Sequence, residues 1–142
     1  MKFLAIHLAY FSKSLVNVQE LSLRNQAIFL DTYITNGLYS NMVIKLLRQV
    51  SAYIDTLPKE QRAIIYAVLE DIKQYGLQAP LVSMRQIKGK LWEVKISQIR
   101  IFYVVIEKNT MVLLHVYKKQ SQRAPQHEIE TALRRMKDVL EN

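Results

Sequence analysis

The sequence predicts an α+β domain, in which an N-terminal helical hairpin and a C-terminal helix pack on an antiparallel sheet of three or four strands. Changes in the spacing of apolar residues support this prediction. Between residues 42 and 75 they recur every three or four positions, as on one face of a helix, whereas between residues 92 and 117 they tend to alternate, as in strands. After Pro125 the helical spacing returns. Helices therefore precede and follow one run of strands.

The predicted hairpin consists of two helices. The apolar residues of the segment 43–54 occupy one face of the first helix. The second helix should begin near Leu57 and Pro58, because proline suits the first turn and Glu60 complements the positive end of the helix dipole. Gly76 is placed to end this helix, since glycine readily adopts the left-handed conformation found after many helices.

Four segments of the next part read as strands of a meander. In the first long strand Trp92, Val94 and Ile96 alternate with polar residues, so this strand should bury one face, with Trp92 in the core. The following strand is apolar on both faces apart from Arg100, as expected at the centre of a sheet. The segments are 82–87, 92–96, 99–106 and 111–117, with turns at 88–90 and 107–110, and the final helix opens at Pro125 and Glu128.

The last strand raises the question of which sheet face stays open. Helices packed on one face of the sheet should leave the other face free. We expect the free face to be the side that carries His115. Strict alternation would give that side Met111, Leu113, His115, Tyr117 and Lys119, and would give the other side Val112, Leu114 and Val116.

Length and composition limit the class of protein. At 142 residues the chain fits one compact domain, and half of it is apolar, which suffices for a core. It contains no cysteine, which excludes disulfides and thiolate metal sites, and its three histidines are widely spaced. We therefore expect no metal and no cofactor.

The start of the chain does not predict a membrane span or a secretion signal. The apolar run Met1–Tyr10 is far shorter than the roughly 18 to 20 residues that cross a bilayer. It also lacks a small-residue cleavage site after its apolar part. We expect a cytoplasmic protein.

Most of the positive charge lies in one part of the chain. The formal net charge is +8. Between residues 85 and 123, nine lysines and arginines stand against only Glu93 and Glu107, which leaves +7, whereas residues 1–41 carry only +1. Protein surfaces normally mix both signs, so this excess indicates a polyanionic partner, of which nucleic acid is the commonest.

The chain divides into an N-terminal extension of uncertain structure, residues 1–41, and a main domain, residues 42–142. Within the extension Leu4 to Tyr10 alternates like a strand, and residues 23–34 keep helical spacing. Two interpretations stay open at this point. The extension is either an extended or misassigned start, or a genuine addition that pairs with the sheet or with a partner.

Three stretches of the main domain together resemble a known family. They read LPKEQRAIIYAVLEDIKQYG, KGKLWEVKISQIRIFYVV and VLLHVYKKQSQRAPQHEIETALRRM. Their motifs and order are similar to the phage-derived HigB-like branch of the RelE toxin superfamily, over about residues 42–142, and imply its RelE-like α+β fold. Two features depart from the family. Residues 1–41 match nothing in it, and Lys95 stands where the family has an arginine, which keeps the charge but loses bidentate phosphate geometry.

The resemblance implies the toxin of a type II toxin–antitoxin system. Such a toxin is a ribosome-dependent, metal-independent endoribonuclease, or mRNA interferase, that cleaves messenger RNA in the decoding site. A ribose 2′-hydroxyl attacks the adjacent 3′-phosphate and leaves a cyclic phosphate and a free 5′-hydroxyl. The reaction needs a base, a positive clamp and an acid. The resemblance also implies a cognate helix-turn-helix antitoxin as partner.

Four residues are candidates for catalysis. Arg100 suits the scissile phosphate, because a guanidinium fork matches two phosphate oxygens, but it could instead pair with Glu93 across the sheet. His115 could act as base or acid near neutral pH, but a lone histidine on an apolar strand is more often a core residue. Lys95 and Lys119 could neutralise the reacting phosphate or assist proton transfer, or they could be solvated surface lysines.

A second set of residues consists of candidates for binding RNA. Cationic side chains could contact the phosphate backbone. A tyrosine such as Tyr103 or Tyr117 could stack on a base or share in proton transfer, although each could equally be core. The binding candidates are Lys88, Lys90, Tyr117, Lys118 and Arg123.

Two other functions stay open at this point. A toxin of the same fold could inhibit DNA gyrase by binding it as a protein. The chain could also be a catalytically inactive RNA-binding module, because Lys95 replaces an arginine. The presence of Arg100, His115 and the lysine pair favours the nuclease.

Overall fold

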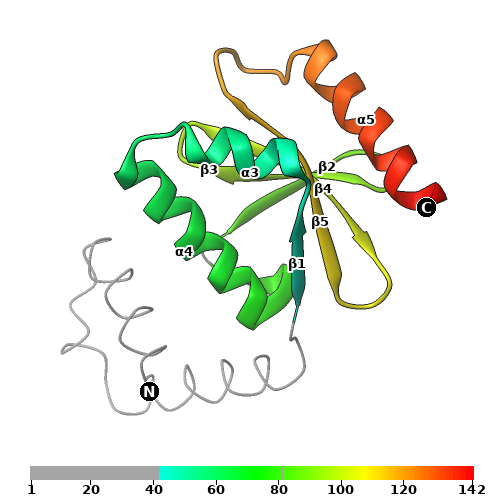
Figure 1. Ribbon diagram of the computed structural model, residues 1–142, viewed down its shortest axis with the longest axis horizontal. Coiled ribbons are helices and arrows are strands. Elements are labelled where there is room, and N and C mark those ends of the chain that lie inside the picture. Colours follow the sequence, from blue (N-terminus) through cyan, green and yellow to red (C-terminus); the bar gives the residue numbers. More distant parts are fainter. Residues whose placement is uncertain (1–41, 81) are drawn as a thin grey trace. The chain divides into compact units, whose positions relative to one another are not determined.

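The computed structural model describes residues 42–80 and 82–142 (Figure 1). The expectations for residues 1–41 lie outside this part of the chain. The elements are β1 (Val43–Leu46), α3 (Arg48–Asp55), α4 (Lys59–Tyr75), the 3₁₀ helix η2 (Gly76–Gln78), β2 (Ser83–Lys88), β3 (Leu91–Ile96), β4 (Ile99–Ile106), β5 (Thr110–Lys118) and α5 (Gln126–Glu141). The α+β class is therefore confirmed, and none of these helices is long and apolar enough to span a membrane.

The strands form one mixed sheet in the order β1-β5-β4-β3-β2. Strands β2 to β5 form the predicted antiparallel meander. The prediction of an all-antiparallel sheet with at most four strands was wrong, because β1 adds a fifth strand parallel to β5. The segment that forms β1 was assigned to the first helix.

Backbone pairing explains why Val43–Leu46 is extended. Its backbone lies along β5, and the flanking bonds continue this pairing, since Val43 N donates to Asn109 O over 2.7 Å and Leu47 N donates to Leu113 O over 3.1 Å. Helix α3 therefore begins only at Arg48. A four-residue apolar segment does not reveal by its spacing whether it continues a helix or joins a distant strand.

The second predicted helix is confirmed as α4. It begins directly after Pro58 and carries Glu60 in its first turn. It ends at Gly76, whose φ of 67° and ψ of −154° place it in a region that is essentially restricted to glycine. The two helices pack on one sheet face through Val50 and Ile54 of α3 and the apolar side of α4.

The opposite face of the sheet is not wholly free, contrary to expectation. Helix α5 lies across the sheet from α3 and α4 and packs on part of this second face (Figure 1). Ala132 of α5 is fully buried in a second apolar cluster with Phe102 and Leu114. Only the remainder of this face is left for polar side chains.

A β-bulge in β5 breaks the strict alternation that the sequence suggested. Tyr103 of β4 pairs with Leu113 and Phe102 pairs with His115, so Leu114 is an extra residue on β5. Leu113 consequently packs with α3 and α4, whereas Leu114 packs beneath α5. The prediction that His115 shares its side with Met111 and Leu113 was wrong for this reason.

Trp92 does not lie in the core as expected. It keeps 37% of its surface exposed, whereas its neighbours Leu91 and Glu93 are fully buried on the opposite face. Alternation correctly predicts that Trp92 shares a face with Val94, but it does not tell how far the covering helices extend along a strand.

Candidate functional site

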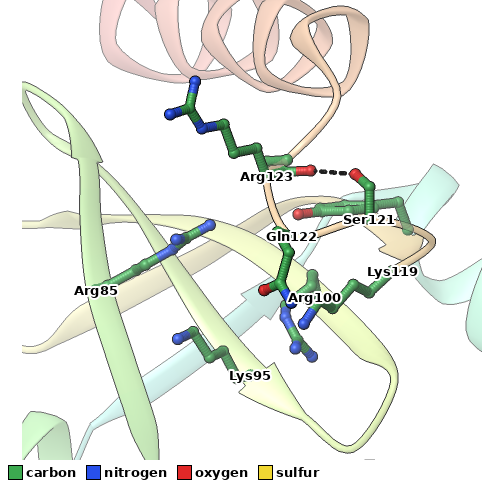
Figure 2. A pocket seen from close by; sticks show the side chains of 9 residues that line it. Arg85, Lys95, Arg100, Lys119, Ser121, Gln122 and Arg123 are labelled. Carbon is green, nitrogen blue, oxygen red and sulfur yellow. Dashed lines mark hydrogen bonds between the residues drawn. The ribbon is translucent and has the colours of Figure 1, made fainter.

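The part of the second sheet face that α5 leaves uncovered forms an open hollow of about 210 Å³ (Figure 2). Side chains from β2 to β5 and from the segment that leads to α5 surround it. Among these lining residues five are cationic and none is acidic. They are Arg85, Lys95, Arg100, Tyr117, Lys119, Ser121, Gln122, Arg123 and Ala124.

Strand register explains why these residues meet. Lys95 of β3 lies opposite Arg100 of β4, and Arg100 lies opposite Tyr117 of β5. Three neighbouring strands thus place these side chains in one row on the second face. Arg85 of β2 lies opposite Glu93, two residues before Lys95, and so points to the same face.

Arg100 is buried, with 8% of its surface exposed, and lies in the middle of this row. Its Nη1 donates to the carbonyl oxygens of Ser97 and Ile99 over 2.7 and 2.9 Å. It forms no ion pair with any residue that the structure describes, so the alternative pairing with Glu93 was wrong. A buried cation without a carboxylate partner is suited to an external anion.

The segment after β5 supplies the other wall of the hollow. Lys119 N donates to Gln98 O over 2.8 Å, which ties this segment to the turn between β3 and β4. Figure 2 shows the Lys119 side chain extending toward Arg100, whereas Arg123 extends away from it. Ser121 Oγ donates to Arg123 O over 2.7 Å and stabilises the bend.

Tyr117 is bound to a buried carboxylate. Its Oη donates to Glu93 Oε1 over 2.7 Å, and Arg85 Nε donates to Glu93 Oε2 over 2.8 Å. Burial, together with the hydrogen bond and the charge of Glu93, raises the pKa of Tyr117, although Arg85 and Arg100 act in the opposite direction. Glu93 itself is fully buried.

The ring of Tyr117 is not available for a base. It is only 5% exposed and stacks on Phe102 with a centroid distance of 5.3 Å. The suggestion that the ring of Tyr117 stacks on a base is therefore wrong, although Tyr117 is one of the residues that line the hollow. Tyr103 lies on the opposite face, where its hydroxyl bonds Met84 Sδ over 3.1 Å and burial raises its pKa to about 12.

His115 does not line the hollow. Its Nδ1 lies 2.9 Å from Arg135 Nη1, and its Nε2 is hydrogen-bonded to Glu128 Oε2. Arginine can only donate, so Nδ1 must accept, and the ring proton must lie on Nε2, from which it is donated to Glu128. Arg135 Nη1 also donates to Leu114 O over 3.0 Å. The histidine thus fastens α5 to the bulged strand.

The remaining binding candidates are exposed and lie outside the hollow. Lys88 ends β2 and Lys90 follows in the turn, whereas the hollow lies toward the other end of β3. Lys118 lies opposite Ile99, which faces α3 and α4, so it points away from Arg100. Their contact with RNA stays a prediction.

Sequence reasoning missed several residues at the hollow. Charge alone could have suggested Arg85, and the alternation along β3 placed Glu93 on the polar face. Neither signal reveals that a carboxylate is buried between Arg85 and Tyr117. Ser121, Gln122 and Ala124 lie on an irregular segment without a periodic signal.

The expectation that the protein binds no metal stays a prediction. Within residues 42–80 and 82–142 no group of three or more His, Cys, Asp or Glu side chains could hold a metal ion. The polar residues that line the hollow are five cations, a tyrosine, a serine and a glutamine.

Comparison with protein families shows a match over most of the described part. The family model for "Phage derived protein Gp49-like (DUF891)" matches residues 52–137, which is more than half of the chain. This range includes every residue that lines the hollow. No curated protein matches the chain.

A solved structure shares the fold. It is described as "Crystal structure of archaeal RelE-RelB complex from Pyrococcus horikoshii OT3", and the similarity has a TM-score of 0.51 at 17% sequence identity. The match covers 59% of this chain and 99% of that chain. At this identity it shows a common, RelE-like fold.

Proposed function

This chain belongs to the Gp49-like family of phage-derived proteins, and from that premise we propose that it is the toxin of a type II toxin–antitoxin system. Its activity in this proposal is ribosome-dependent cleavage of messenger RNA. The RelE-like fold and the motifs that resemble the HigB-like branch support this activity.

One observation carries the proposal. Arg100 is buried without a carboxylate partner among the described residues, and it borders a hollow that four other cations surround. A phosphodiester brings two charged oxygens that a guanidinium can bind, and the transition state for cleavage concentrates more negative charge there. The hollow therefore has the charge that this reaction requires.

The roles of the lining residues follow from their positions. Arg100 would hold the scissile phosphate, because two backbone carbonyls fix its guanidinium. Lys95 and Lys119, from opposite sides, would neutralise the charge that develops on the phosphorus-bound oxygens. No residue of this set reads a base, so the ribosome would present the transcript and define the position of the cut.

We propose an antitoxin as the protein partner. The related structure is described as a RelE-RelB complex, which supports a two-protein assembly for this chain as well. The resemblance of the motifs implies a helix-turn-helix protein. The bound antitoxin would keep the toxin inactive, and loss of the antitoxin would release an active toxin.

Induction in cells tests the proposed function. Expression of the full chain alone should arrest growth, and co-expression of the antitoxin, which we expect to be encoded beside this gene, should relieve the arrest. Mapping of RNA ends should reveal discrete cuts within translated frames. Arrest without such cuts would instead indicate a protein target such as gyrase, and salt-sensitive RNA binding without arrest would indicate an inactive binding module.

A matched pair of variants links the activity to the hollow. Arg100→Ala should remove both the arrest and the cuts. Lys108→Ala removes an exposed cation in the turn between β4 and β5, at the other end of β4 from Arg100, and should leave both unchanged. Equal toxicity of the two variants would contradict the assignment of the site.

A further inference from the structure

We propose that Tyr117, oriented by Glu93, accepts the ribose 2′-hydroxyl and its proton in the cleavage step. Glu93 is then a positioning residue, because it acts on the substrate only through Tyr117. This inference rests on the proposed endoribonuclease function. It assigns the proton acceptor, a role for which His115 is not placed, since both of its ring nitrogens are bound beneath α5.

The hydrogen bond to Glu93 determines whether the Tyr117 hydroxyl can donate or accept a hydrogen bond at the hollow. A phenol has one proton, and that of Tyr117 points to Glu93 Oε1, 2.7 Å away. Tyr117 is one of the residues that line the hollow, and its hydroxyl oxygen can therefore only accept a hydrogen bond from a group bound there. Lysine and arginine can only donate, so they suit phosphate oxygens but cannot receive a hydroxyl proton while they are charged.

Other acceptors at the hollow are less well fixed. Ser121 and Gln122 both lie on the exposed segment between β5 and α5. Tyr117 instead stands on β5, where it pairs with Arg100 of β4, and its ring is held against Phe102. A group that accepts a proton in the transition state is more effective when its position is fixed relative to the substrate.

Glu93 has the contacts of a positioning residue. It is fully buried, and its two oxygens accept from Tyr117 and from Arg85. Arg85 compensates the buried charge and prevents the carboxylate from rotating away. A substrate in the hollow would therefore interact with this carboxylate only indirectly, through Tyr117 or Arg85.

The proposed step conserves atoms and charge. The 2′-oxygen forms a bond to phosphorus as the bond from phosphorus to the 5′-oxygen breaks. The 2′-hydroxyl proton passes to Tyr117 Oη, while the proton of Tyr117 passes to Glu93 Oε1. A lysine ammonium at the hollow, Lys95 or Lys119, gives a proton to the departing 5′-oxygen. Solvent later restores the carboxylate and the ammonium.

This relay agrees with the state of the phenol. Burial and Glu93 raise the pKa of Tyr117, so a free phenolate is disfavoured. The relay never forms one, because Tyr117 loses one proton as it gains another. A deoxyribose lacks the 2′-hydroxyl, so the same contact would restrict cleavage to RNA.

Single-turnover cleavage on translating ribosomes tests the inference. The substrate is a defined messenger RNA whose cut site has been mapped with the wild-type full chain. Tyr117→Phe and Glu93→Gln should each lower the cleavage rate by about a hundredfold, the usual contribution of a proton-transfer group. The protein concentration at half-maximal rate should not change, because neither residue is proposed to bind the phosphate.

Tyr103→Phe is the matched control. It removes the hydroxyl of another buried tyrosine, on the opposite face, which bonds Met84 Sδ among the described residues. This variant should cleave at the wild-type rate. Circular dichroism should show that each variant is folded. If Glu93→Gln fails to fold, the cleavage rate of Tyr117→Phe alone tests the inference.

The outcomes separate this inference from the proposed function. A wild-type chain that cuts no ribosome-bound messenger would overturn the proposed function. A wild-type chain that cuts, with Tyr117→Phe at the wild-type rate, would overturn the relay alone. A loss of apparent affinity without a loss of rate would also overturn it, because the tyrosine would then be a binding residue.

Discussion

Arg100 is the residue on which the proposed site depends most. Its guanidinium bonds two carbonyls of the β3–β4 turn, so its removal should cost roughly 1–3 kcal/mol of stability while the sheet remains intact. Arg100→Ala should lower cleavage by more than about a hundredfold, since it removes the fixed charge opposite the phosphate. Thermal unfolding and cleavage assays on the same sample measure the two effects. A folded but fully active variant would contradict the assignment.

Lys95 permits a sharper test of phosphate contact. Each contact with a single-stranded phosphate changes the slope of log affinity against log salt by about 0.7, so Lys95→Ala should reduce the slope by this amount. Lys108→Ala removes an exposed lysine of the turn between β4 and β5, outside the hollow, and should leave the slope unchanged. Titration of a short single-stranded RNA at several salt concentrations gives both values. Identical slopes for the two variants would indicate that the hollow binds no phosphate.

His115 shows the limit of prediction at the residue scale. The sequence identified a histidine within a cationic stretch, and that alone suggested acid–base chemistry. Its partners Glu128 and Arg135 lie 13 and 20 residues further along the chain, on a helix whose docking position the sequence does not give. Arg100, by contrast, was predictable, because a cation in an otherwise apolar strand is conspicuous.

At the scale of elements, the contact between α5 and β5 depends on Arg135. It bonds both His115 Nδ1 and the carbonyl of Leu114, the extra residue of the bulge. Arg135→Leu would leave both acceptors unsatisfied, and we expect a loss of roughly 1–3 kcal/mol in the free energy of unfolding. Arg134→Leu, at the adjacent exposed position, is the control and should have little effect. Urea denaturation compares the two, and equal stabilities would contradict this role for Arg135.

The end of α4 offers a second test at this scale. Gly76 adopts a backbone conformation that side chains strongly disfavour, so Gly76→Ala should lower the free energy of unfolding by roughly 1–3 kcal/mol. Gly89 also has a positive φ, of 55°, but a Cβ there would meet nothing within 4 Å. Gly89→Asn should cost less than Gly76→Ala, because asparagine adopts a positive φ more readily than other residues with a side chain. Chemical denaturation measures both variants, and a neutral Gly76→Ala would contradict the account of the helix end.

Elements with a strong local pattern could be predicted, and those set by distant contacts could not. Helix α4 and strand β4 were correct because caps, periodicity and length agree along one segment. Strand β1 was missed because its extended form depends on pairing with β5, more than sixty residues away. The bulge at Leu114 likewise depends on how β4 and β5 align, which the composition of β5 does not encode.

At the scale of the whole molecule, the two faces of the sheet differ in what covers them. One face is covered by α3 and α4 and forms the larger apolar cluster. The other is divided between α5 and the cationic hollow. The charge excess between residues 85 and 123 could be predicted from sequence. The meander explains how five of its nine cations gather at the hollow, because neighbouring strands place side chains side by side on one face.

The most direct test is cleavage of a defined messenger RNA in a reconstituted translation system. We predict that the wild-type chain cuts the ribosome-bound messenger and leaves a 2′,3′-cyclic phosphate and a 5′-hydroxyl, and that Arg100→Ala leaves it intact. The same RNA without ribosomes should stay uncut. An intact messenger with both proteins, or equal cutting by both, would contradict the claim that the hollow at Arg100 holds and cleaves a phosphodiester.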